Sequence, residues 1–151
     1  MLAKNKSGWT LLEYLKINEE EIANYNNVTG SFAIININGK YLIGFNSWRN
    51  QWEFPAGGIE KGETAREAAG RELFEETHQK NNNLEFRGLF KIMNPDGEVK
   101  YQAIFLGFQD ELISFEKRDG DEMDKIMLWD LKEDIGYVDE CDLKMVELSC
   151  V

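Results

Sequence analysis

Three glutamates fall close together on a segment that the sequence predicts to be helical. The segment spans residues 64–77. At about 100° of rotation per residue, Glu72, Glu75 and Glu76 share an arc of about 100°, interleaved with small alanines and bordered by Leu73. Carboxylate oxygens are the ligands that Mg²⁺ prefers, so this arc could hold a divalent metal ion.

The alternative interpretation is a solvated acidic face. Such a face places its acids opposite the apolar residues of the helix. Here the acids lie among the apolar residues. Like charges three or four positions apart also repel by a few tenths of a kcal/mol per pair. A compensating cation would remove that repulsion, and geometry alone leaves both interpretations open.

Two neighbouring features fit a metal site. Arg71 lies one turn before Glu75 and could orient its carboxylate, although an ordinary helix ion pair explains it as well. Ahead of the helix, Gly57 and Gly58 would let the backbone approach a ligand closely and leave a carbonyl free for a metal. Taken alone, these glycines also fit a plain turn.

Together these residues resemble the Nudix box, the signature G-x5-E-x7-R-E-U-x-E-E-x-G-U, in which U is a bulky aliphatic residue. The box would occupy residues 57–79, and the positions that match at the required spacing are Gly57, Glu63, Arg71, Glu72, Leu73, Glu75 and Glu76. Two positions depart: His78 replaces the glycine and Gln79 the final aliphatic residue. We expect His78 to be an exposed helix C-cap with positive φ, with a catalytic role as the alternative.

The resemblance implies a set of metal ligands. Glu75 and Glu76 would bind Mg²⁺ (or Mn²⁺), with the carbonyl of Gly57 as a further ligand. Glu72 would bind the metal or accept a proton from the attacking water. These roles come from the family and are expectations for this chain.

The resemblance also implies an activity and two supporting residues. Arg71 would orient a glutamate, and Glu63 would support the site from behind or stabilise the loop before the helix. With Glu72 they form the expected catalytic set of a Nudix hydrolase. The expected reaction is metal-dependent hydrolysis of a phosphoanhydride bond in a nucleoside triphosphate or a nucleotide sugar such as ADP-ribose. A non-catalytic nucleotide-sensing domain and an acidic interaction module are the alternatives.

Outside the Nudix box, the sequence indicates candidate site residues less specifically. Some relatives take an extra acid from a later loop, and Glu122 in the stretch 119–124 is the candidate metal ligand, with a solvated loop acid as the alternative. Arg49 could bind a substrate phosphate, although an exposed loop arginine explains it too. Aromatic side chains could stack on a base, but we expect core packing for each: Trp48, Trp52, Phe90 and Tyr101.

The elements that must position these residues follow from periodicity and turns. Residues 10–23 look partly helical, with a break at Ile17-Asn18. Asn38-Gly39 predicts a hairpin. The expected elements are strands at 31–37 and 40–45, a short apolar piece at 52–54, the helix at 64–77, strands at 84–93, 100–108 and 125–131, and a helix at 139–148. This order predicts one α+β domain over residues 1–151, an α/β/α sandwich around a mixed sheet.

Composition narrows the partners. The net charge of −11 argues against a nucleic acid polymer, which needs a basic surface. The resemblance implies a small nucleotide as the partner. No apolar run reaches the roughly 20 residues of a membrane helix, and no signal peptide is evident, so we expect a cytoplasmic protein without a membrane partner. Cys141 and Cys150 would be free thiols. The oligomeric state stays open, a homodimer included.

Overall fold

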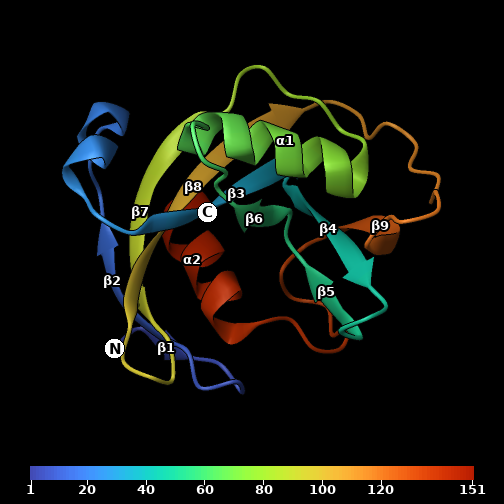
Figure 1. Ribbon diagram of the computed structural model, residues 1–151. Coiled ribbons are helices and arrows are strands. Elements are labelled where there is room, and N and C mark those ends of the chain that lie inside the picture. The colour runs from blue at the N-terminus through green and yellow to red at the C-terminus, as the bar shows by residue number, and fades with distance from the viewer.

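The chain forms one mixed sheet with an α-helix on each face (Figure 1). The computed structural model describes residues 1–151. In chain order the elements are β1 (Ala3–Lys4), β2 (Thr10–Leu15), the 3-10 helix η1 (Glu19–Asn24), β3 (Val28–Ile37), β4 (Lys40–Asn46), β5 (Gln51–Glu53), β6 (Ala56–Gly58), α1 (Ala65–Thr77), β7 (Glu85–Met93), β8 (Val99–Gln109), β9 (Met123–Trp129) and α2 (Glu140–Cys150).

The strands follow the order β1-β2-β7-β8-β3-β4-β5, with β6 also paired to β3 and β9 to β4. The β3–β8 pair is parallel, and the other strand pairs are antiparallel. The central strand β3 is buried on both faces over most of its length, which agrees with the apolar run 32–35 in its sequence. The sheet is mixed, as the sequence predicts.

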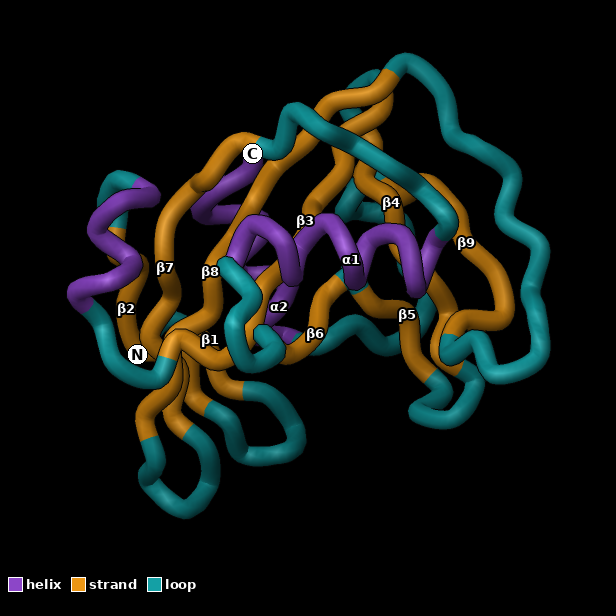
Figure 2. Tube along the Cα trace, turned by 45° about the horizontal axis from the view of Figure 1, so that its top comes forward, coloured by secondary structure: helices purple, strands orange, loops and turns teal.

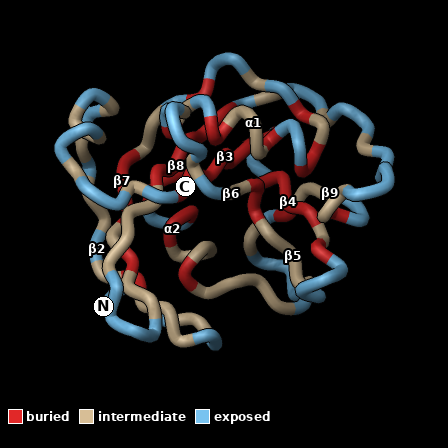
Figure 3. The backbone as a smooth tube through the Cα atoms, viewed as in Figure 1, coloured by how far each residue is buried: buried red, intermediate tan, exposed pale blue.

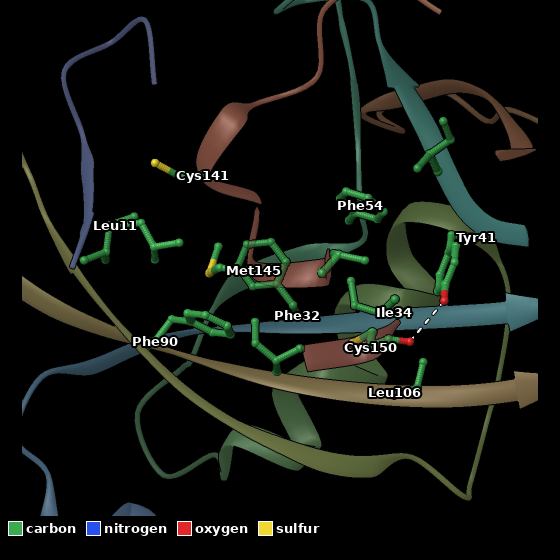
Figure 4. Packing of buried hydrophobic residues seen from close by; sticks show 14 of the residues in the cluster. Leu11, Phe32, Ile34, Tyr41, Phe54, Phe90, Leu106, Cys141, Met145 and Cys150 are labelled. Atoms are coloured by element: carbon green, nitrogen blue, oxygen red, sulfur yellow. Dashed lines mark hydrogen bonds between the residues drawn. The ribbon is translucent and has the colours of Figure 1, made fainter. Parts of the chain in front are cut away.

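Alternate residues of β3 belong to two separate cores. Much of β3 is drawn as buried in Figure 3. Phe32 and Ile34 pack with α2, whereas Ala33 and Ile35 pack with α1. Figure 4 shows the core on the α2 side, where the Tyr41 hydroxyl donates to the carbonyl of Cys150 at 3.0 Å. The two helices therefore cover opposite faces of the sheet, which confirms the expected α+β sandwich.

The hairpin and the box helix are confirmed. Asn38 and Gly39 both have positive φ, 53° and 85°, as the tight turn between β3 and β4 requires. At the start of α1, the side chain of Thr64 accepts from the backbone N–H of Glu67, and the side chain of Glu67 accepts from the backbone N–H of Thr64. This capping box fixes where the helix begins.

The helical expectation for residues 10–23 is wrong in its first half. Residues Thr10–Leu15 form β2, which pairs antiparallel with β7. Leu11 is fully buried, and the Tyr14 ring stacks on Phe90 with ring centroids 4.5 Å apart. These long-range contacts outweigh the local spacing of the leucines. After the break at Ile17-Asn18, a short helical turn does form, as η1.

The remaining differences are at element boundaries. Strand β9 begins two residues earlier than the expected 125–131, next to a register shift in its pairing with β4. The two short strands β1 and β6 had no periodic signal in the sequence.

Cys141 and Cys150 are buried free thiols on α2, as expected. No helix has the length and apolar character needed to cross a membrane.

Candidate active site

Helix α1 packs on the sheet through an apolar inner face. Ala65, Ala69 and Leu73 are buried against β3 and its neighbours. The Ser31 hydroxyl of β3 donates to the carbonyl of Ala65 at 2.7 Å, which fixes the start of the helix on the strand. The acidic arc flanks this inner face, so Glu76 is also buried, with 6% of its surface exposed.

Strand β6 brings the backbone before the helix against two of the glutamates. The backbone N–H of Ala56 donates to Oε1 of Glu76 at 2.9 Å. A Cβ atom on Gly57 would lie only 2.3 Å from Cδ of Glu72, so a larger residue would displace that carboxylate from its present position. The box glycine therefore lets the end of the Glu72 side chain lie close to the backbone of β6.

Arg71 holds three carboxylates together. It donates to both oxygens of Glu63 at 2.8 and 2.9 Å, to Glu72 at 2.8 Å and to Glu75 at 3.3 Å. These bonds hold the pKa of Glu63 at about 2. Burial raises the pKa of Glu72, and the bond from Arg71 opposes that rise. Glu63 thus keeps its charge and fixes the guanidinium that orients the other two acids.

Burial disfavours the charged form of the Glu76 carboxyl. Burial raises its pKa to about 9, the hydrogen bond from Ala56 opposes this, and the nearby Glu72 and Glu122 add to the rise. A divalent ion beside these acids would reverse the effect by stabilising the charged form. Carboxylate oxygens together with a backbone carbonyl oxygen, such as that of Gly57, are a donor set that suits Mg²⁺.

The acids are not arranged as a finished metal site. No group of three or more His, Cys, Asp or Glu side chains lies in a cluster ready to hold an ion. Glu72 and Glu75 point to Arg71 instead, and Glu75 is about half exposed, at 56%. Ligation would therefore require these two side chains to rotate away from Arg71. The residues fit a metal by chemistry and proximity, with a change of rotamer.

A cleft of about 440 Å³ lies beside the C-terminal half of α1 and contains all three helix glutamates. Across it lie Arg118, Asp121 and Glu122, from the loop between β8 and β9. The cleft continues into a hollow of about 400 Å³, which shares Glu72, Glu76 and Glu122 with it. A third hollow of about 470 Å³ shares Phe32, Arg49 and Gln102 with the second.

The structure brings Glu122 to this cleft and Arg49 to the adjoining hollow, from distant parts of the chain. An Arg49 nitrogen lies 3.6 Å from a carboxylate oxygen of Glu122 and another lies 3.0 Å from Glu53. Trp48 is 71% exposed at the edge of the cleft, so the expectation of core packing is wrong for this side chain. Trp52, Phe90 and Tyr101 do pack against the core.

Two residues of the cleft differ from the sequence-based expectation: His78 was expected to be exposed, and Arg118 was not predicted. His78 is the C-cap with φ 63°, as expected, but its side chain is 12% exposed, so the expectation of an exposed residue is wrong. It is covered by the ring of Phe115. Arg118 gave no signal of its own, except that it follows Lys117 in an otherwise acidic loop.

Comparisons with known proteins agree with this geometry. An RNA pyrophosphohydrolase from Baumannia cicadellinicola subsp. Homalodisca coagulata is 54% identical over 44 residues, which cover 29% of this chain and only 28% of that protein. A Bacillus subtilis pyrophosphohydrolase has a similar fold, with a TM-score of 0.66 and 21% identity over 88% of this chain and 79% of that one. The NUDIX domain of Shewanella oneidensis NrtR, in complex with ADP ribose, gives a TM-score of 0.63 and 16% identity over 87% and 95%.

At these identities the two structures establish the fold alone. The family model of the NUDIX domain, however, matches residues 27–146, which span the sheet from β3 to β9, helix α1 and most of α2. The chain therefore belongs to the NUDIX domain family.

Proposed function

We propose that this protein is a metal-dependent pyrophosphohydrolase that cleaves a phosphoanhydride bond in a nucleoside diphosphate linked to another group. The observation that carries the proposal is the cleft in which Glu72, Glu75, Glu76 and Glu122 meet. Four acids around one cavity, with one of them deeply buried, need cations before a polyphosphate can approach. Membership of the family and the complete set of box glutamates support the same reaction.

Each residue of the site has a role in this reaction. Glu75, Glu76 and the carbonyl of Gly57 would hold Mg²⁺ or Mn²⁺, with Glu122 as a further ligand. Bound metal lowers the pKa of water and stabilises charge on phosphate oxygens. Glu72 accepts the proton of the attacking water, because burial makes its carboxylate a stronger base than an exposed glutamate.

Arg71 and Glu63 keep that base in place. The guanidinium occupies Oε1 of Glu72 at 2.8 Å, which leaves the other oxygen for the water. The water oxygen forms a bond to one phosphorus, and the bond from that phosphorus to the bridging oxygen breaks. The reaction gives two phosphate-containing products. Glu63, paired through both oxygens with Arg71, prevents the guanidinium from turning away.

The substrate would extend along the connected hollows. Arg118 lines the cleft and Arg49 lines the adjoining hollow, and both could pair with phosphate oxygens once the substrate displaces their present neighbours. Trp48, exposed at the rim, offers a face on which a base could stack. The remaining volume, with Phe32 and Gln102 in its wall, is large enough for a nucleoside.

The experiment measures phosphate and nucleotide products from nucleoside triphosphates, ADP-ribose and dinucleoside polyphosphates, with Mg²⁺ or Mn²⁺ and with chelator. A 5′-triphosphorylated oligoribonucleotide belongs in the panel because the curated relative is named an RNA pyrophosphohydrolase. We expect turnover that needs metal and falls at least about a hundredfold in Glu75→Gln and Glu76→Gln, or roughly 2.7 kcal/mol of barrier.

Glu67→Gln is the matched control. It removes one charge from the exposed side of the same helix, and glutamine keeps the capping-box acceptor, so activity should be unchanged. Metal-independent turnover, or full activity in both site variants, would contradict the proposal. Nucleotide binding without turnover would instead support a sensing domain, the second candidate, which the fold shared with an ADP-ribose-bound NUDIX domain makes reasonable.

A further inference from the structure

The loop between β8 and β9, residues 110–122, forms one wall of the cleft but has little structure of its own. It contains no helix or strand (Figure 2). Its only backbone–backbone hydrogen bond is an internal turn, from the N–H of Asp121 to the carbonyl of Arg118. No backbone–backbone bond therefore ties the loop to the rest of the fold, although Arg118, Asp121 and Glu122 must face α1 to line the cavity.

Gln79 supplies the missing backbone partner. Its side-chain amide donates to the carbonyl of Ile113 at 2.7 Å and accepts from the N–H of the same residue at 3.0 Å. This is the pair of bonds that a neighbouring strand would make. Gln79 is fully buried, and Gln109 and Thr77 complete its hydrogen bonds. A buried amide bonded on both sides is costly to break, because its partners would be left unsatisfied.

His78 holds the second half of the loop. The αL conformation at the end of α1 directs its ring into the cleft wall. The ring lies 4.6 Å from that of Phe115, measured between centroids, and Nε2 lies 3.5 Å from a carboxylate oxygen of Asp121. Only 12% of the His78 side chain is exposed, because the loop covers it. His78 and Gln79 thus contact the loop at Ile113, Phe115 and Asp121.

We propose that His78 and Gln79 form a latch that holds the loop 110–122 against the end of α1, and so keeps Arg118 and Glu122 at the cleft. They are the two positions at which this chain departs from the box signature, and both departures contact the same loop. The effect on catalysis rests on the proposed function, but the tethering of the loop does not. Both are positioning residues, since neither needs to touch the reacting atoms.

The test is limited proteolysis with trypsin, which cleaves after Lys117 and Arg118, the two basic residues of the loop. His78→Gly removes the ring while glycine keeps the αL cap, and Gln79→Leu removes the two bonds to Ile113. We expect cleavage at these two sites to accelerate roughly tenfold in each variant, because cleavage follows the population of the opened loop. Lys80→Gln, exposed and without contact to the loop, is the control with a wild-type rate.

A double variant separates the ring contact from general loosening. If the His78 ring acts through Phe115, the pair His78→Gly and Phe115→Ala should accelerate cleavage no more than either change alone. In the hydrolysis assay at saturating metal, the latch variants should raise KM roughly tenfold with kcat changed by less than about threefold, because Glu75, Glu76 and the Gly57 carbonyl would still hold the metal.

The outcomes distinguish this inference from the proposed function. Unchanged cleavage in both His78→Gly and Gln79→Leu would overturn the latch, whether or not the protein hydrolyses any nucleotide. Faster cleavage with unchanged KM would overturn the positioning role. If the wild type hydrolyses nothing, the proposed function fails, and the cleavage rates still decide whether the two residues hold the loop.

Discussion

The clearest prediction concerns Gly57→Ala, because the structure gives the displacement that the new methyl group would cause. Its Cβ would lie 2.3 Å from Cδ of Glu72, whereas ordinary contacts begin at 3.4 Å, so the carboxylate must move by 3.4 − 2.3 = 1.1 Å. A misplacement of about 1 Å at a catalytic group costs roughly a hundredfold in rate, or ~2.7 kcal/mol. We therefore expect kcat/KM to fall by about that factor.

The same substitution should hardly change stability. Gly57 does not have the positive φ that excludes alanine, and the group in the way is the end of a flexible side chain. We expect the free energy of unfolding to change by less than about 1 kcal/mol, or roughly 2–4 °C in Tm. Gly58→Ala is the matched control, since its Cβ would meet only the carbonyl oxygen of Thr29 at 3.8 Å.

The assay is steady-state hydrolysis of the best substrate, with thermal unfolding of the same samples. A loss of activity confined to Gly57→Ala, at nearly constant Tm, is the expected pattern. The reasoning would be refuted by Gly57→Ala activity within about threefold of wild type. The reasoning would also fail if Gly58→Ala lost as much activity as Gly57→Ala, because the two glycines would then act only through the shape of the turn.

Three further predictions concern residues of the same helix. Arg71→Lys should lower kcat at least about tenfold and raise the pKa of Glu63, since a lysine cannot pair with both its oxygens; unchanged kinetics and an unchanged NMR titration of Glu63 would contradict this. In metal-free protein, the raised pKa of Glu76 means that the folded state binds more protons than the unfolded one between pH 4.5 and about 9. Stability should therefore fall as pH rises through that window, and Glu76→Gln should remove this part of the slope in urea unfolding series. Gly70→Ala should add up to about 1 kcal/mol of stability without loss of activity, since its Cβ meets nothing within 4 Å, and a destabilised variant would count against this.

Local sequence patterns predicted the structure correctly where local contacts determine it. The capping box at Thr64 and the hairpin at Asn38-Gly39 each close within a few residues, and both form as predicted. Residues 10–15 show the opposite case. Their leucines could follow a helix or a strand, and the choice is made by β7, which begins seventy residues later in the chain. No local pattern carries that information.

In the candidate site, too, some residues are placed by local geometry and others by long-range contacts. One helix fixes the relative places of Glu72, Glu75 and Glu76, so helical geometry alone predicts that they lie together. Glu122 reaches them through a loop without regular structure, and its place depends on what holds that loop.

The two positions that break the box signature explain why the loop lies where it does. A glycine and an aliphatic residue in place of His78 and Gln79 would end α1 equally well, but neither could bond to the backbone of Ile113 or cover Phe115. A mismatch to a motif therefore carries information that a match does not. Matching residues indicate the chemistry shared with the family, whereas departures that make buried, hydrogen-bonded contacts indicate what this chain does differently around that chemistry. If the latch holds, substrate binding by this enzyme depends on His78 and Gln79, which position the loop 110–122. The box glutamates alone would not determine it.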